Sequence, residues 1–413
     1  MIINNFSENV LDSGGKKVSA EIHWEDCDRP VKEIYFEVSK EHRDKIALNA
    51  APFLLASFIP AIKTMEKRVK VDEYVCPETI LGIQRTGAFI SHWHYPDRES
   101  QIVIETKRKN KNPIDRVPKR KSAFFFSGGI DSLATLLRNR EIYPKDNENS
   151  ISYGITAYGL EIEKKEQLSP VETKLDTIAD QAGIERITLK TNVRSLDENW
   201  QFWEYQWQGS VLASLAHVFA PSIHLVYIAS TIDYRNLKPY GSHPLIDPVL
   251  GSSYMRIVHD GLSMTRLEKV KLVSKYEYAL NNLRCCNQVH KYDDEYINCG
   301  ECEKCMRTML ALHVIGKLNE TKSFRDSRIT AEKINTLARL SKTSIIWWRE
   351  FAPFIKESFD PDLYTAVNTK VFGARIGSAS NQRLKALKEK FGKVDKKIFG
   401  GKIRSLKRQI DRT

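Results

Sequence analysis

Apolar and polar residues alternate in two different ways along the chain, and the change falls near residue 120. Before it, short strand-like runs surround one helix-like stretch, which predicts an α+β accessory domain over residues 1–115. The expected strands are residues 17–23, 33–37, 79–83 and 101–106, and the expected helix runs from residue 42 into residue 67. The basic, proline-containing residues 107–120 predict a linker.

From residue 122 on, short apolar runs alternate with stretches of helical spacing. The expected strands are residues 123–126, 152–158, 186–189 and 223–229, with helices at 133–140, 171–182 and 202–219 between them. This alternation predicts an α/β domain over residues 122–318, in which a parallel, doubly wound sheet carries helices on both faces. Residues 319–413 are predicted to form a helical, basic C-terminal region.

Between the first strand of the α/β domain and its helix lies the hexapeptide Ser127-Gly128-Gly129-Ile130-Asp131-Ser132. Adjacent glycines let a ligand approach the backbone, the two serines add hydroxyl donors, and the first amides of the helix favour an anion. Asp131 would repel a bare phosphate, so a cation such as Mg²⁺ is expected between them. The hexapeptide therefore predicts a nucleotide-phosphate site, whereas the alternative is a simple turn with an N-cap.

This hexapeptide resembles the PP-loop of the ATP pyrophosphatase superfamily, whose members cleave ATP between the α and β phosphates. The resemblance implies that residues 127–132 bind ATP and that Asp131 acts through Mg²⁺. Tyr158 and Ser230 fall at the carboxyl ends of the expected strands 152–158 and 223–229, where ligands of such sheets bind, and are further candidates for ATP contact. Neither G-x-x-x-x-G-K-[ST] nor G-x-G-x-x-G follows the strand, which excludes two other phosphate-binding motifs.

A cysteine cluster lies downstream, with C-x-x-C-x-x-C spacing at Cys299, Cys302 and Cys305 and with Cys285 and Cys286 before it. Four thiolates suit a closed, tetrahedral Zn²⁺ site, and an iron–sulfur cluster is the alternative. Adjacent side chains diverge, so only one of Cys285 and Cys286 can be the fourth ligand.

The pattern C-G-x-C-x-x-C-x-R, which ends at Arg307, is similar to the zinc site of 7-cyano-7-deazaguanine synthase, where an earlier cysteine completes the tetrad. Residues 265–270 resemble that family's S-K-x-E-I-V segment, with Arg266 in place of the lysine. The resemblance covers residues 122–318 and implies Cys286, or else Cys285, as the fourth ligand. Arg266, and Lys269 where the family segment has isoleucine, are the candidate catalytic cations. The resemblance implies an ATP-dependent synthase with ATP, Mg²⁺ and Zn²⁺ as cofactors. A carboxylate or amide of a 7-deazaguanine-type purine analogue would be adenylated, with release of AMP and pyrophosphate.

Two other functions are compatible with these motifs. Synthase-like proteins with extra terminal domains occur in bacterial anti-phage defence operons, so the same chemistry can modify a protein or nucleic-acid partner from such an operon. The second alternative is a non-catalytic nucleotide-binding module that holds nucleic acid, and the intact hexapeptide and cysteine cluster count against it.

Histidines and aromatic residues form two further groups of interest. His243 and His259 follow the last expected strand and are candidates for substrate contact, with a structural role as the alternative. His92 and His94 alternate, as metal ligands on one strand face would, but they also fit an aromatic packing or recognition surface. The aromatic residues at 203, 205 and 207 are expected mainly in the core.

Composition and charge restrict the compartment and the partners. Hydrophobic residues make up 41% of the chain, and the N-terminus lacks a secretory pattern. Prolines interrupt the longest apolar run of the chain, residues 48–62. These features predict a cytoplasmic protein that does not enter a membrane. The formal net charge is +12, and residues 370–413 carry fourteen Lys/Arg against three Asp/Glu. This tail predicts weak nucleic-acid binding, or else a solvated basic face.

Overall fold

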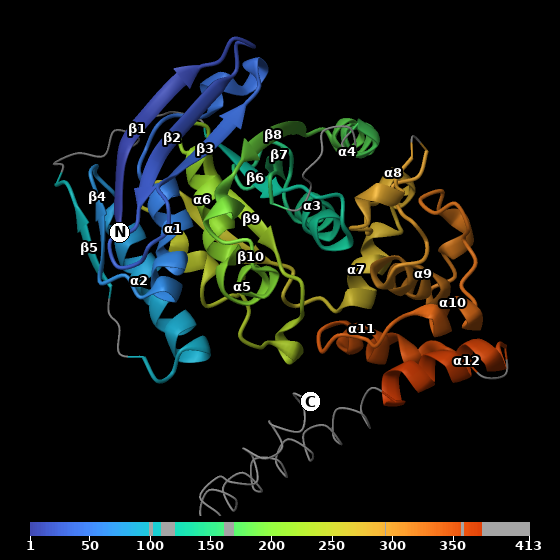
Figure 1. Cartoon of the computed structure of the whole chain (residues 1–413). Coiled ribbons are helices and arrows are strands. Elements are labelled where there is room, and N and C mark those ends of the chain that lie inside the picture. Colours follow the sequence, from blue (N-terminus) through green and yellow to red (C-terminus); the bar gives the residue numbers. More distant parts are fainter. Residues whose placement is uncertain (99–101, 109–119, 161–168, 294, 357–358, 374–413) are drawn as a thin grey trace, which may run out of the picture. The chain divides into compact units, whose positions relative to one another are not determined.

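The computed structural model describes residues 1–98, 102–108, 120–160, 169–293, 295–356 and 359–373 (Figure 1). The chain divides into two compact units. The first comprises Met1–Gly300 and Ile315–Ser327, and the second comprises Glu301–Val314 and the part that begins at Arg328. Most of the predicted linker and of the basic tail, with its predicted nucleic-acid binding, lies outside the described residues.

The first unit is an α/β structure built on a mostly parallel sheet of ten strands in the order β10-β9-β6-β7-β8-β3-β2-β1-β4-β5 (Figure 1). The predicted α/β class is thus confirmed at this level. The strands are β1 (Ile2–Val10), β2 (Lys16–His23), β3 (Lys32–Val38), β4 (Arg68–Val71), β5 (Val103–Thr106), β6 (Lys121–Phe125), β7 (Ile151–Tyr158), β8 (Glu185–Thr191), β9 (Ile223–Ala229) and β10 (Arg256–Asp260).

Two sequence predictions of secondary structure are corrected. Residues 79–83 are not a strand, because they lie in α2 (Pro77–His94), whose buried residues repeat at helical spacing. The helix expected from residue 42 into residue 67 is a 3₁₀ turn (Lys40–Lys45) followed by α1 (Ala51–Thr64). His92 and His94 therefore end a helix rather than share a strand face. Strands β1, β4 and β10 were not predicted.

One sheet joins the two regions that the sequence pattern separates. Strand β3 pairs antiparallel with β8, with Phe36 opposite Thr191 and Val38 opposite Leu189. A single hydrophobic cluster also contains buried residues from both regions, including Phe36 and Ile187. The strands before residue 115 therefore extend the sheet of the α/β region instead of forming a sheet of their own.

Helices pack on both faces of the sheet. Ala123 belongs to the hydrophobic cluster that includes α1 and α6 (Gln208–Val218), whereas its neighbour Phe124 is buried outside that cluster. Because neighbouring side chains of a strand point to opposite faces, Phe124 faces the other layer. That layer includes α3 (Ile130–Ile142), which packs against α7 (Arg266–Val273), and α4 (Ser169–Ala182), which packs against α8 (Glu277–Asn282).

The strand order places a switch point beside β6. The chain goes from β6 to β7 and β8 on one side, and it returns to β9 and β10 on the other. All five of these strands are parallel. In open α/β sheets, ligands bind beyond the carboxyl ends of the strands at such a point. The loops after β6 and β9 therefore flank the expected ligand position.

The second unit is helical where it is described, with α9 (Glu303–Val314), α10 (Ala331–Thr336), α11 (Ser344–Phe351) and α12 (Pro361–Asn368). Helix α11 packs on α9 through Trp347 and Trp348. The Arg307 guanidinium of α9 lies 3.9 Å from the Trp347 ring centroid, and Trp348 donates a hydrogen bond to Glu303 of α9. No helix in the described ranges has the length and apolar character needed to span a bilayer.

Candidate phosphate loop and cysteine cluster

The hexapeptide forms the turn from β6 into α3, as predicted. Gly128 has a φ of +74°, which a residue with a side chain rarely adopts, and a Cβ there would lie 2.7 Å from Leu175. The loop is closed by hydroxyl contacts, because Ser127 Oγ accepts from the Gly129 N–H at 3.3 Å and lies 3.2 Å from Ser132 Oγ. Leu133 N–H makes the first bond within the helix, to the Gly129 carbonyl, so the three preceding N–H groups have no acceptor inside the helix.

Asp131, Arg266 and Lys269 lie together beside this loop. Arg266 Nη1 donates to Asp131 Oδ2 at 2.6 Å, and Lys269 Nζ donates to Asp131 Oδ1 at 3.0 Å. The side chains of Arg266 and Lys269 are only 8% and 2% exposed, so both cations are buried. Burial alone would raise the pKa of Asp131, but the two cations outweigh it and hold the pKa below the usual value. The three predicted catalytic residues thus form one charged triad.

Helix α7 positions both cations, and its start is readable from the sequence. Thr265 Oγ1 accepts from the Glu268 N–H at 3.3 Å, while the Glu268 carboxylate accepts from the Thr265 N–H at 2.8 Å. This capping box fixes the first turn of the helix, which contains Arg266 and Lys269. Lys269 also donates to the backbone carbonyl of Ser230 and so connects the loops that follow β6 and β9.

Tyr158 and Ser230 lie at the carboxyl ends of β7 and β9, as expected, but their side chains are engaged within the protein. The Tyr158 hydroxyl donates to Glu172 at 3.1 Å. Burial is the main cause that raises the pKa of Tyr158, and the charge of Glu172 raises it further. The Ser230 hydroxyl is buried and donates to the Ile232 carbonyl at 2.5 Å. The direct link of Ser230 to the triad is therefore its carbonyl oxygen.

His243 and His259 meet at a buried carboxylate, Asp247, which the sequence analysis missed. His259 Nδ1 lies 2.7 Å from Asp247, whose side chain is fully buried, and the His243 N–H donates to the same carboxylate at 3.3 Å. Burial is the main cause that lowers the pKa of His243, and the nearby His259 lowers it further. An aspartate that orients a histidine in this way can support acid–base chemistry at the other ring nitrogen.

The histidine pair and the triad lie on opposite faces of the sheet. Asp260, next to His259 on β10, pairs with Arg138 of α3. His259 points the other way, toward Asp247, which packs so closely on α6 that a Cβ on Gly209 would lie 2.3 Å from its Oδ1. The structure therefore does not bring the two histidines into the phosphate loop.

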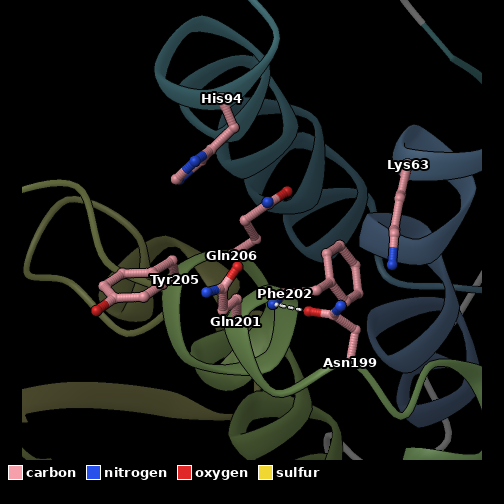
Figure 2. A pocket seen from close by; sticks show the side chains of 7 residues that line it. All are labelled: Lys63, His94, Asn199, Gln201, Phe202, Tyr205 and Gln206. Atoms are coloured by element: carbon pink, nitrogen blue, oxygen red, sulfur yellow. Dashed lines mark hydrogen bonds between the residues drawn. The ribbon is translucent and has the colours of Figure 1, made fainter. Parts of the chain in front are cut away.

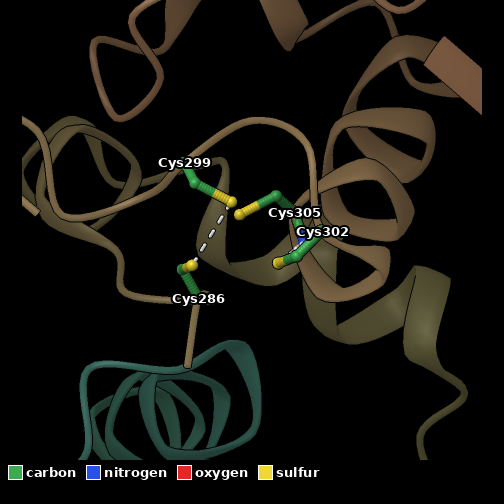
Figure 3. A group of neighbouring side chains, drawn as sticks. All are labelled: Cys286, Cys299, Cys302 and Cys305. Carbon is green, nitrogen blue, oxygen red and sulfur yellow. Dashed lines mark hydrogen bonds between the residues drawn. The ribbon is translucent and has the colours of Figure 1, made fainter. Parts of the chain in front are cut away.

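Four cysteine side chains converge downstream (Figure 3). The Sγ atoms of Cys286, Cys299, Cys302 and Cys305 all lie within 4.8 Å of one another, and such a group can hold a metal ion such as zinc. Tetrahedral zinc with bonds of about 2.3 Å needs sulfur atoms about 3.8 Å apart, so the donor set fits. Cys285 is outside the group, and its thiol donates to Asn298 Oδ1 at 3.2 Å. Gly300, with a φ of +70°, makes the turn between the second and third cysteines.

Asn298 organises the segment that carries Cys286, and it was also missed. Its Oδ1 accepts the N–H groups of Cys285 and Cys286 at 2.8 and 3.1 Å, and its Nδ2 donates to the Leu283 and Ser323 carbonyls. The same segment contacts the phosphate loop, because the Arg284 N–H donates to the Gly128 carbonyl at 2.8 Å. The cysteine cluster and the loop are thus connected through two residues of backbone.

Asn298→Ala is expected to weaken metal binding about 10–100-fold, because partners that orient metal ligands have effects of this size. The variant leaves all four thiols in place but removes the acceptor that fixes the Cys286 backbone. Competition with a chromogenic chelator would measure the affinity. Asn282→Ala is the matched control, since the Asn282 side chain donates to the Tyr278 carbonyl within its own helix α8 and contacts none of the cysteines among the described residues. Equal affinities in the two variants would show that Asn298 does not position the ligands.

A separate polar cavity of about 290 Å³ lies beside the π-helical turn Trp203–Trp207 (Figure 2). Its lining residues are Lys63, His94, Asn199, Gln201, Phe202, Tyr205 and Gln206. Trp203 and Trp207 are buried, which confirms the expectation of a packing role, whereas Tyr205 faces the cavity. Figure 2 shows that the lining residues come from separate helices.

Comparison with known proteins returned no match to a family model, to a curated protein or to a solved structure.

Proposed function

We propose that this protein is an ATP-dependent synthase that adenylates its substrate and releases pyrophosphate. The observation that carries the proposal is the position of the loop of residues 127–132 at the switch point of the parallel sheet, with the charged triad beside it. Helix amides without an acceptor inside the helix, a glycine with positive φ and two buried cations are the features that a bound triphosphate needs. The sequence resemblance to the PP-loop superfamily points to the same chemistry.

The residues of the loop have separable roles in this proposal. The amides that begin α3 and the hydroxyls of Ser127 and Ser132 would bind phosphate oxygens. Arg266 and Lys269 would stabilise the negative charge that develops as pyrophosphate leaves, and Asp131 would hold both cations in position. Each carboxylate oxygen of Asp131 keeps a second lone pair, which is where Mg²⁺ would bind. Mg²⁺ would neutralise charge on the triphosphate.

The substrate class follows from the resemblance rather than from a cavity. The family adenylates a 7-carboxy-7-deazaguanine, so we propose a carboxylated purine analogue as the acceptor. In this proposal zinc is structural, because four thiolates leave no open coordination position. The bond from Arg284 to Gly128 would then let the metal support the loop.

Complete reaction mixtures are expected to convert ATP to AMP and pyrophosphate, because the loop would present the α-phosphorus to the acceptor oxygen. The assay uses ATP labelled at the α-phosphate, with Mg²⁺, ammonium and carboxylated deazaguanine, and separates the nucleotides by chromatography. Omission of the acceptor is the control. Release of ADP would contradict the proposal. Label or mass added to a protein or nucleic acid from the same operon would instead identify a macromolecular acceptor for the same chemistry.

A further inference from the structure

A second cavity, of about 690 Å³, lies at the amino ends of three neighbouring parallel strands. Arg120 immediately precedes β6, His224 is the second residue of β9, and Arg256 opens β10. The phosphate loop follows the carboxyl end of β6. At about 3.3 Å per residue, the five residues of β6 separate the two sites by roughly 17 Å. This cavity is therefore distinct from the site of the proposed ATP chemistry.

Positive charge dominates the lining of this cavity. The charged lining groups are the guanidinium groups of Arg85, Arg120 and Arg256 and one carboxylate, Glu78. Among the described residues, neither Arg85 nor Arg256 forms an ion pair, and the hydrogen bond of Arg256 to Asn149 Oδ1 is a 3.3 Å contact with a neutral group. Guanidinium groups present paired donors that match phosphate oxygens, so their concentration around a hollow favours an anionic ligand.

The walls of the cavity are held in place by close packing. Gly82 of α2 lies against the loop before β10, where a Cβ would come within 1.7 Å of the Val249 carbonyl oxygen. Thr79 Oγ1 donates to the Gly251 carbonyl at 3.0 Å, and Arg120 Nη1 donates to the Tyr254 carbonyl at 2.5 Å. The Arg120 side chain and the backbone segments that carry Arg85 and Arg256 are thus held in place, which lowers the cost of forming the site around a ligand.

His224 adds an atom without a partner. Its Nδ1 lies 3.0 Å from the Arg120 carbonyl oxygen and must carry the hydrogen, because a carbonyl can only accept. Its Nε2 is buried and has no hydrogen-bond partner in the described part of the chain. Burial lowers the pKa of His224, although Glu148 nearby opposes this effect. A bound anion would raise the pKa and make Nε2 a donor.

We propose that this cavity binds the phosphate group of a nucleotide. The guanidinium groups and His224 would hold the phosphate, and the apolar side chains of Leu81, Pro248 and Val249 at the same cavity would contact the sugar or base. A free nucleotide and a single-stranded nucleic acid share this phosphate chemistry. The volume lies within the range of sites for small ligands.

Arg85→Gln/Arg256→Gln tests the proposal in the full-length protein. The probes are thymidine 5′-monophosphate, measured by calorimetry, and a fluorescent oligothymidylate, measured by anisotropy at several salt concentrations. A pyrimidine avoids competition from a site for ATP. The double variant is expected to bind both probes at least about tenfold more weakly than the wild type, because it loses charge-assisted hydrogen bonds to the phosphate. With the oligonucleotide, the slope of log affinity against log salt should fall by about two.

Arg349→Gln is the matched control, because it removes one exposed guanidinium from α11, outside the cavity. Binding of thymidine monophosphate that the double variant loses would identify a free nucleotide as the ligand. Binding of the oligonucleotide alone, lost in the same variant, would identify a single strand. The proposal is overturned if neither probe binds, or if the double variant and the control bind as the wild type does.

Discussion

Asp131→Ala is expected to abolish ATP cleavage and to lower the free energy of unfolding by about 3–5 kcal/mol. The sequence alone predicts a loss of only about 1 kcal/mol, the scale of a helix cap on a solvent-facing helix. The structure corrects this expectation, because Asp131 is the shared partner of two buried cations, Arg266 and Lys269. Removing the carboxylate leaves both positive charges buried without it.

Variants can separate the two effects of Asp131. Denaturant titration measures stability, and release of pyrophosphate measures turnover at a temperature where each variant remains folded. Asp131→Ala/Lys269→Met removes one charge of each sign, so it should regain part of the lost stability while staying inactive. Asp131→Ala with the turnover of the wild type would contradict the proposed role of the triad.

The contribution of Asp131 to stability should depend on pH in one direction. Because the pKa of Asp131 is lowered in the folded protein, its ionised form is stabilised by folding. This contribution is complete above the ordinary pKa of aspartate and is lost as the pH falls through the lower, folded-state value. The stability difference between wild type and Asp131→Ala should therefore shrink in acid and stay constant near neutral pH.

Local pattern predicted much of the fold, and long-range pairing accounts for what it missed. Strands β6 to β9 are apolar runs bounded by turns, so their positions could be predicted. Strand β1 contains Asn4, Asn5 and Asn9, and asparagine is depleted in strands, so the strand forms because β2 and β4 pair with it. Residues 79–83 are rich in β-branched side chains, but burial along α2 decided their helical structure.

The candidate site shows the same limit. Residues 127–132 and the cysteine spacing were visible because their chemistry is local in sequence. Asp247 and Asn298 were not, because each is defined by partners that only the fold brings to it. The triad joins residues 135 and 138 positions apart, and no periodicity encodes that contact. The Thr265–Glu268 capping box was the one local signal that could have located the helix that carries both cations.

Cys302→Ala is expected to give protein that is unstable or insoluble, with less than one equivalent of zinc per chain. Zinc bound by four thiolates contributes to folding on the order of 10 kcal/mol, and three thiolates cannot close the tetrahedron. Elemental analysis of purified wild type and variant measures the metal, and thermal denaturation measures stability. Cys285→Ala is the matched control, because Cys285 is adjacent to a ligand but outside the group of four.

Loss of the metal should also disturb the structure of the phosphate loop. Cys286 lies two residues after Arg284, and the Arg284 N–H donates to the Gly128 carbonyl. The Tyr292 hydroxyl links Cys286 to Arg284, because it donates to the Cys286 carbonyl and accepts from Arg284 Nε. Any soluble fraction of Cys302→Ala should therefore bind ATP more weakly than Cys285→Ala does. Zinc binding displaces the protons of the cysteine thiols, so zinc affinity should fall as the pH is lowered. If elemental analysis of the wild type finds iron instead of zinc, the four cysteines hold an iron–sulfur cluster. If the protein is active without any metal, the four cysteines have no structural role as metal ligands.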